Sequence, residues 1–250
     1  MADTHFHLRP DREETARVVQ FLAFLEAACQ VDHLILLGDI FDFWFDYPHF
    51  RLKGYEEILL ALDRVKSAGV EIHFVGGNHD IWATRYLNER YGVAGDGLPQ
   101  ILQLGHRRIL LNHGDGLLSH DWIYSSFRWL VRHRAGILFA KAWHPELLFA
   151  FSSWLSGTSR NVTREEADAI LHKASRWLQA QPPGDWELLV IGHVHHPFIV
   201  EHEGRIMAAL GGWLGRAEYG LYQDGEFSLH DFDRDPPPTR RNALVPSDPE

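Results

Sequence analysis

The sequence is short of cysteine, of long apolar runs and of positive charge, and each shortage excludes a class of protein. A single cysteine, Cys29, rules out an intrachain disulfide, argues against a thiolate metal site and fits the reducing cytoplasm. No run approaches the roughly 18 consecutive apolar residues of a membrane span, so a soluble protein is expected. The net charge of -10 argues against a general nucleic-acid binder, because neutralising phosphates requires clustered Lys and Arg.

What is present favours a packed enzyme-sized domain. Hydrophobic residues make up 45% of the 250 positions, which is enough for a sizeable core. Histidine is abundant, with 17 copies, and it is the commonest metal ligand as well as the natural acid or base near neutral pH. Histidines that cluster with other ligand-type residues are therefore candidates for a functional site.

Short apolar runs, each followed at once by a glycine-containing polar turn, predict strands. The runs are LILL (34–37), IHFV (72–75), ILLN (109–112), LLVI (188–191) and IMAAL (206–210). Helical spacing of apolar residues predicts helices between the first of them, over Asp11 to Cys29 and Tyr55 to Ala68. Strands that alternate with helices indicate an α/β fold with layered, substantially parallel sheets.

The stretch at about 120–181 differs, because it is rich in aromatic and small residues and has no strand-like run. We predict a helical insertion, whose last helix starts with the capping box Thr163 and Glu166. The proline-rich and charged composition of 235–250 predicts a disordered tail. Residues 1–234 are accordingly expected to form one domain that carries the insertion as a cap.

Ligand-type side chains follow the predicted strands. Since ligands bind at the carboxyl ends of parallel strands, these side chains should converge on one rim; they are Asp39, Asn78, His79, His113, His193 and His195. Oxygen and imidazole ligands without thiolate suit Mn²⁺, Fe²⁺ or Zn²⁺. Six or seven such groups are enough for two ions about 3.5–4 Å apart, the arrangement that promotes phosphoryl transfer.

Each motif has an ordinary explanation when it is taken alone. Gly-Asp after a strand is a common turn, and Asn78 between glycines and His79 is typical of a left-handed turn. A His-x-His pair places two side chains on the same side of any extended segment. Taken together, however, these explanations are improbable, because four separate strand ends would have to carry the same kind of ligand by chance.

In chain order, the motifs Asp-x-His, Gly-Asp, Gly-Asn-His-Asp, His-Gly-Asp and Gly-His-x-His resemble the calcineurin-like metallophosphoesterase family, from Asp3 to about Trp213. The resemblance implies a metallophosphoesterase fold, with mixed β-sheets flanked by helices and an inserted helical cap. It also implies two divalent ions, most readily Mn²⁺. One ion would be held by Asp3, His5, Asp39 and His195, and the other by Asp39, Asn78, His113 and His193. His79 would be the catalytic residue that is not a ligand, donating to a phosphoryl oxygen or protonating the leaving group. Asp80 would either orient His79 or close the turn through backbone hydrogen bonds.

The segment HGDGLLSHDWIYSSFRW is similar to one branch of the family, the UDP-2,3-diacylglucosamine diphosphatases of lipid A synthesis. The resemblance implies an acylated sugar-nucleotide substrate bound through Asp121, Tyr124 and Arg128. Ser159 and Arg160 would add a polar anchor near the end of the cap. Nine aromatic and five basic residues between His120 and Arg160 suit such a ligand, or alternatively form the core of a small helical subdomain.

One residue departs from that branch, because this chain has His79 where the best-known members have arginine. Two other hypotheses therefore stay open. The protein could act on a different phosphomonoester, phosphodiester or nucleotide, or it could be a non-catalytic scaffold that binds a partner through the cap. Contact of the apolar, basic cap with the inner face of the cytoplasmic membrane is also open.

Asp3 and His5 are preceded here only by Met1 and Ala2, whereas family members place several apolar strand residues before this aspartate. We expect the native chain to begin upstream with an apolar segment. If it begins at Met1, the ion held by Asp3, His5 and His195 should be the weaker of the two, since fraying ends hold ligands poorly.

Overall fold

The computed structural model describes residues 1–45, 53–118, 164–182 and 184–237. Its elements, in chain order, are α1 (Arg12–Ala28), β1 (His33–Leu36), α2 (Glu56–Ser67), β2 (Glu71–Val75), the 3₁₀ helix η1 (Ile81–Ala83), α3 (Thr84–Tyr91), β3 (Ala94–Gly97), β4 (Gln100–Leu104), β5 (Arg107–Leu111), α7 (Arg164–Ala180), β6 (Leu188–Ile191), β7 (Phe198–His202), β8 (Arg205–Ala209), β9 (Glu218–Gln223) and β10 (Glu226–Asp231).

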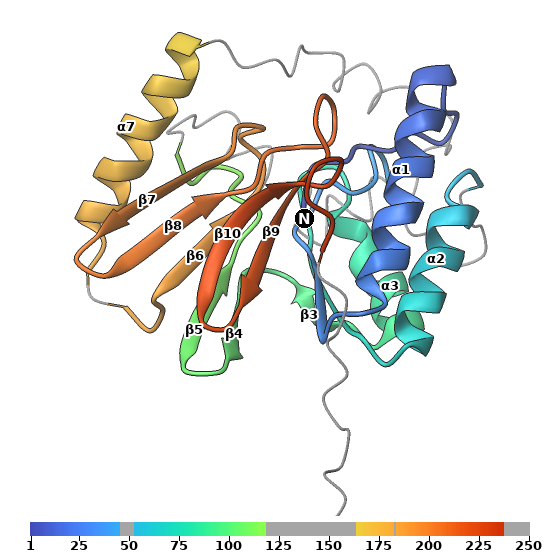
Figure 1. Cartoon of the computed structure of the whole chain (residues 1–250), viewed down its shortest axis with the longest axis horizontal. Coiled ribbons are helices and arrows are strands. Elements are labelled where there is room, and N and C mark those ends of the chain that lie inside the picture. Colours follow the sequence, from blue (N-terminus) through green and yellow to red (C-terminus); the bar gives the residue numbers. More distant parts are fainter. Residues whose placement is uncertain (46–52, 119–163, 183, 238–250) are drawn as a thin grey trace, which may run out of the picture.

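The strands form two larger sheets and a hairpin. Strands β1, β2 and β3 make a parallel sheet in that order, and the larger sheet has the order β4-β5-β6-β8-β7. In the larger sheet the three central strands run parallel, while β4 and β7 pair antiparallel at its edges. Strands β9 and β10 form an antiparallel hairpin (Figure 1).

The helices flank these sheets, and α1 and α2 lie within the two stretches predicted to be helical, Asp11 to Cys29 and Tyr55 to Ala68. Helix α1 starts after Asp11, whose side chain accepts a hydrogen bond from the Glu14 N–H and so caps the helix. Helices α1 and α2 lie side by side against the three-stranded sheet, and α7 covers the other side of the molecule against β7 and β8 (Figure 1). No helix in the described part of the chain has both the length and the apolar character needed to cross a membrane.

Three apolar clusters hold the layers together. The largest joins α1, α2 and α3 to β1 and β2 and includes the fully buried rings of Phe21, Phe74 and Trp213. A second lies between the ends of β1 and β2, the larger sheet and the β9–β10 hairpin. The third places Ala174 and Leu178 of α7 on the larger sheet. Strands β1, β2, β5 and β6 are thereby fixed with their carboxyl ends close together.

The first residues of the chain run alongside β1 and the loop after it. The Met1 amino group donates to the Ile35 carbonyl, and the Asp3 N–H donates to the Gly38 carbonyl at 3.1 Å. The His5 N–H donates to the Asp39 carbonyl at 2.9 Å, and Phe6 forms a parallel bridge with Phe41. Met1 and Ala2 are buried, so this segment is an integral part of the core.

The predicted α/β class is confirmed, and all five apolar runs form strands. The parallel pairing of the apolar runs is confirmed for the central strands, and the antiparallel edges make the larger sheet mixed, as the family resemblance implies. Of the predicted cap at about 120–181, residues 164–181 lie in the described part, and the residues before 164 lie outside it. Of the predicted tail, Asp235 accepts a hydrogen bond from the Tyr219 hydroxyl, and 238–250 lie outside the described residues.

Candidate metal centre

The loops after β1, β2, β5 and β6 meet the N-terminal segment at one place, as the sequence predicts. The Gly192 N–H donates to the His113 carbonyl at 2.9 Å, which joins the loops after β5 and β6. The His79 N–H donates to Asp39 Oδ1 at 2.9 Å, which joins the loops after β1 and β2. The His193 N–H donates to Asp3 Oδ2 at 2.9 Å, which ties the N-terminal segment to the loop after β6.

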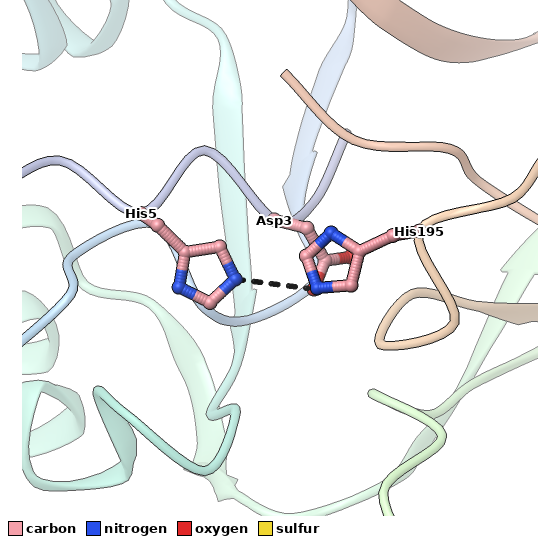
Figure 2. A group of neighbouring side chains, drawn as sticks. All are labelled: Asp3, His5 and His195. Carbon is pink, nitrogen blue, oxygen red and sulfur yellow. Dashed lines mark ion pairs between the residues drawn. The ribbon is translucent and has the colours of Figure 1, made fainter. Parts of the chain in front are cut away.

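One group of ligand-type side chains consists of Asp3, His5 and His195. Figure 2 shows the three side chains converging from the N-terminal segment and from the loop after β6. Asp3 Oδ1 lies 3.8 Å from Nε2 of His5 and 3.8 Å from Nε2 of His195. The two imidazoles stack with centroids 5.2 Å apart. Three ligand atoms therefore face a common point.

A second group consists of Asp39, His113 and His193. His113 Nδ1 lies 2.8 Å from the Leu37 carbonyl, so this nitrogen carries the proton and Nε2 turns toward Asp39, 3.4 Å from Oδ2. The same Oδ2 lies 3.7 Å from His5 Nε2, in the first group. One oxygen of Asp39 thus faces both groups. Asn78 lies in the loop after β2, with its side-chain oxygen buried.

Asp80 is a structural anchor of the site in this arrangement. Its two carboxylate oxygens accept hydrogen bonds from four backbone N–H groups, those of Asp39, Ile40, Phe41 and Gly77, at 2.7–3.3 Å. Asp80 is fully buried and binds the loop after β1 to the loop after β2. Of the two roles left open by the sequence, the geometry favours closure of the turn.

Asp42 is the residue near His79 that sequence reasoning missed. Its Oδ1 lies 3.5 Å from His79 Nδ1 and 3.5 Å from His5 Nδ1, and its backbone carbonyl lies 2.9 Å from His79 Nδ1. Asp42 is 4% exposed, and aspartates are seldom buried this deeply unless they are paired. In the sequence, Asp42 is the second acid of GDIFD, and nothing in the sequence distinguishes it from other acids in loops.

The backbone of the site adopts conformations that side chains rarely tolerate. Among the described residues, seven that are not glycine have a left-handed φ, and five of them are Asp3, His5, Asp39, His193 and His195. Such residues cost on the order of 1–3 kcal/mol each and concentrate at functional sites. Gly38 has φ +83°, and a Cβ there would lie 2.6 Å from both Gly77 N and His113 Nδ1. The loops approach one another at a distance that only glycine allows.

The electrostatics of the site fit bound cations. Burial is the main reason that the pKa of Asp3 rises to about 8, and the Asp39 carboxylate adds to the rise. Burial alone would also raise the pKa of Asp39, but the imidazoles of His113 and His79 hold it well below its usual range. Asp3 Oδ1 and Asn78 Oδ1 are buried without a hydrogen-bond partner among the described residues. Buried oxygens of this kind, beside imidazole nitrogens and without a thiolate, are suited to divalent metal ions.

The predicted substrate-binding residues are not placed by the structure. Asp121, Tyr124, Arg128, Ser159 and Arg160 all lie within 119–163, outside the described residues. Their proposed role therefore stays a prediction.

Comparisons with known proteins identify the family of this chain. The family model described as calcineurin-like phosphoesterase matches residues 1–197. A relative from Photorhabdus laumondii named UDP-2,3-diacylglucosamine hydrolase is 29% identical and covers 93% of this chain and 97% of its own length. A relative of the same name from Porphyromonas gingivalis is 27% identical, over 76% of this chain and 79% of its own. A phosphoesterase structure from E. coli matches with a TM-score of 0.40 at 16% identity, over 89% and 86% of the two chains. The chain belongs to the calcineurin-like phosphoesterase family and is a metal-dependent hydrolase.

Proposed function

We propose that this protein is a two-metal phosphohydrolase that cleaves the pyrophosphate of UDP-2,3-diacylglucosamine to give UMP and lipid X. One observation carries the two-metal part of the proposal. Asp39 Oδ2 faces His5 of one ligand group at 3.7 Å and His113 of the other at 3.4 Å. A carboxylate in that position is suited to bridge two ions, as phosphoryl transfer by a metal pair requires.

The proposed ligands of one ion are Asp3, His5, Asp39 and His195, and those of the other are Asp39, Asn78, His113 and His193. When bound, the ions would supply an activated water and positive charge on the phosphoryl oxygens. The ligand set lacks a thiolate, and Mn²⁺ is the ion we propose, with Fe²⁺ or Zn²⁺ as the alternatives.

The remaining chemistry is assigned to His79. Its Nδ1 faces the carbonyl and the carboxylate of Asp42, so Nδ1 carries the proton, and Nε2 is the nitrogen that we assign to the substrate. We assign His79 to donate to a phosphoryl oxygen or to protonate the leaving group. Asp42 is the positioning residue that holds this tautomer, and it takes the part for which the sequence suggested Asp80.

The assignment of a lipid-linked substrate rests on the names of the relatives and on the composition of the cap. Relatives at 27–29% identity are named UDP-2,3-diacylglucosamine hydrolases, and they match most of this chain. In the cap, we propose that Asp121, Tyr124, Arg128, Ser159 and Arg160 bind the polar part of the substrate and that aromatic residues face the acyl chains. Contact of this cap with a membrane surface is a further prediction.

The decisive experiment compares an acylated with a non-acylated sugar nucleotide. UMP release from UDP-2,3-diacylglucosamine and from UDP-N-acetylglucosamine is measured with Mn²⁺ at matched concentrations. We expect kcat/KM to be higher for the acylated substrate by on the order of 100-fold or more, because each buried CH₂ contributes about 0.8 kcal/mol. Equal rates for the two substrates would contradict a cap that binds acyl chains.

A second candidate function is hydrolysis of a water-soluble phosphomonoester or phosphodiester. The observation that favours it is His79, which stands where the best-known members of the diphosphatase branch carry arginine. The same assay, extended to an aryl phosphate and a cyclic nucleotide, separates the two. A soluble ester that is turned over faster than the acylated substrate would overturn the lipid-linked assignment and leave the two-metal chemistry in place.

A further inference from the structure

A second cluster of ligand-type side chains lies at the opposite end of β1 and β2 from the candidate metal centre. His33 is the first residue of β1, and Glu71 is the first residue of β2. The two are direct partners in the parallel register, and His73 follows Glu71 by two positions. Because partners in register and residues two apart share a face of the sheet, the three side chains project to the same side.

The three side chains approach one another closely. His33 Nδ1 lies 3.1 Å from His73 Nε2 and 3.4 Å from one Glu71 carboxylate oxygen, and the other oxygen lies 3.6 Å from His73 Nε2. Ligands of a tetrahedral ion with metal–ligand distances of about 2.0–2.2 Å are separated by about 3.3–3.6 Å. The cluster therefore has nearly the spacing that such an ion imposes on its ligands.

The surroundings combine a buried ligand with accessible ones. His73 is 1% exposed, and its Nδ1 is buried without a hydrogen-bond partner among the described residues. The side chains of His33 and Glu71 are 30% and 58% exposed, so an ion can reach the cluster from solvent. An imidazole buried this deeply beside a second imidazole and a carboxylate is more than a solvated surface group.

We propose that His33, Glu71 and His73 form a separate binding site for a divalent ion that prefers imidazole, such as Zn²⁺, with water completing the coordination. Two nitrogens and one carboxylate favour Zn²⁺, Ni²⁺ or Cu²⁺ over Mg²⁺ and Mn²⁺. Lys66 lies near enough to His73 to act on it electrostatically, so the site has little net negative charge to attract harder ions. An ion held here would tie the start of β1 to the start of β2. The site is independent of the proposed hydrolysis.

The test counts zinc bound to the full chain. Wild-type protein, His33→Gln and Glu71→Gln are dialysed against the same free Zn²⁺ concentration, and bound zinc is measured by elemental analysis. The exposed partners are substituted because replacing the buried His73 risks misfolding. His172→Gln, at an exposed histidine of α7, is the matched control. Zinc bound at the candidate metal centre contributes equally to the zinc content of all four proteins, so it cancels when they are compared.

We expect wild-type protein and His172→Gln to bind one equivalent of zinc more than His33→Gln and Glu71→Gln. Zinc should also raise the Tm of the first two proteins by more, because an ion that binds only the folded state stabilises it. Equal zinc content in all four proteins would show that the cluster is a hydrogen-bonded histidine pair beside a glutamate, and the proposal would be wrong. Neither result depends on whether any phosphoester is hydrolysed.

Discussion

The two ends of β1 and β2 carry ligand-type side chains in different ways. At the carboxyl ends, the ligand-type side chains sit on loops, and five residues of the centre have a left-handed φ. At the amino ends, His33, Glu71 and His73 sit on regular strands, and strand register alone brings them together. The first arrangement costs backbone strain, and the second costs none.

The difference indicates which site the fold is built around. Strained loops persist only where the surrounding structure over-determines them. Here Asp80 accepts hydrogen bonds from both loops, and Gly38 lets them approach. In the described part of the chain, His33 and His73 have no left-handed φ and lie on regular strands, so the cluster at the amino ends needs no such support. We infer that the carboxyl-end centre is the catalytic one, and that the other cluster would serve stability.

The largest effect is expected from Asp39→Asn. The substitution keeps the volume and removes the charge that faces both ligand groups, so kcat should fall by on the order of 1,000-fold or more. Metal analysis should find less bound Mn²⁺ than in the wild type. Asp168→Asn, at an exposed aspartate of α7, is the control and should retain wild-type turnover. Normal turnover of Asp39→Asn would make the two-metal mechanism wrong.

Alanine at two glycines compares the two ends directly. Gly38 (φ +83°) follows β1 at the catalytic end, and Gly69 (φ +85°) precedes β2 at the other end, with nothing within 4 Å of a Cβ. Gly69→Ala should cost only the left-handed backbone, about 1–2 kcal/mol. Gly38→Ala adds contacts at 2.6 Å with Gly77 N and His113 Nδ1, so it should cost about 2–4 kcal/mol.

The measurement is denaturant unfolding of both variants, together with turnover. Gly38→Ala should also lower activity, since His113 must move to admit the methyl group. If the two variants lost the same stability and the same activity, the close approach of the loops would not be needed for the site.

A smaller effect is expected from Asp42→Asn. Loss of the carboxylate that faces Nδ1 of His5 and His79 should lower metal affinity or kcat by about 10- to 100-fold, as for other groups that orient ligands. The Mn²⁺ concentration for half-maximal activity should rise relative to Asp168→Asn. A variant that lost only thermal stability, with unchanged Mn²⁺ dependence and kcat, would show that Asp42 does not position these histidines.

The central strands and the convergence of ligand-type residues were predictable from sequence for a physical reason. Buried parallel strands such as β6, whose four residues are all buried, appear as continuous apolar runs, and their carboxyl ends meet at one edge of a sheet. Strands β4, β7, β9 and β10 are partly exposed, and their alternating or mixed patterns gave no comparable signal. The apolar runs therefore did not locate the antiparallel edge strands, and the mixed character of the sheet was predicted from the family resemblance alone.

Contacts that depend on register or on loop conformation were not predictable. A shift of one residue between β1 and β2 would place His33 and Glu71 on opposite faces, so their proximity cannot be derived from spacing. Asp42 and Asp80 are both acids in loops next to ligands. Only the folded loops show that Asp80 binds backbone N–H groups while Asp42 faces imidazoles.

The smallest effect is expected from Glu71→Gln in buffer free of metal ions. The Glu71 side chain is 58% exposed, and its contacts with His33 and His73 are screened by solvent, so the free energy of unfolding should change by less than about 0.5 kcal/mol. Denaturant unfolding after chelation of all metal checks this. A larger loss without metal would mean that Glu71 already stabilises the strand pair by itself. A small loss without metal, combined with a smaller rise in Tm on adding Zn²⁺, would show that Glu71 contributes to the free energy of unfolding only when an ion is bound.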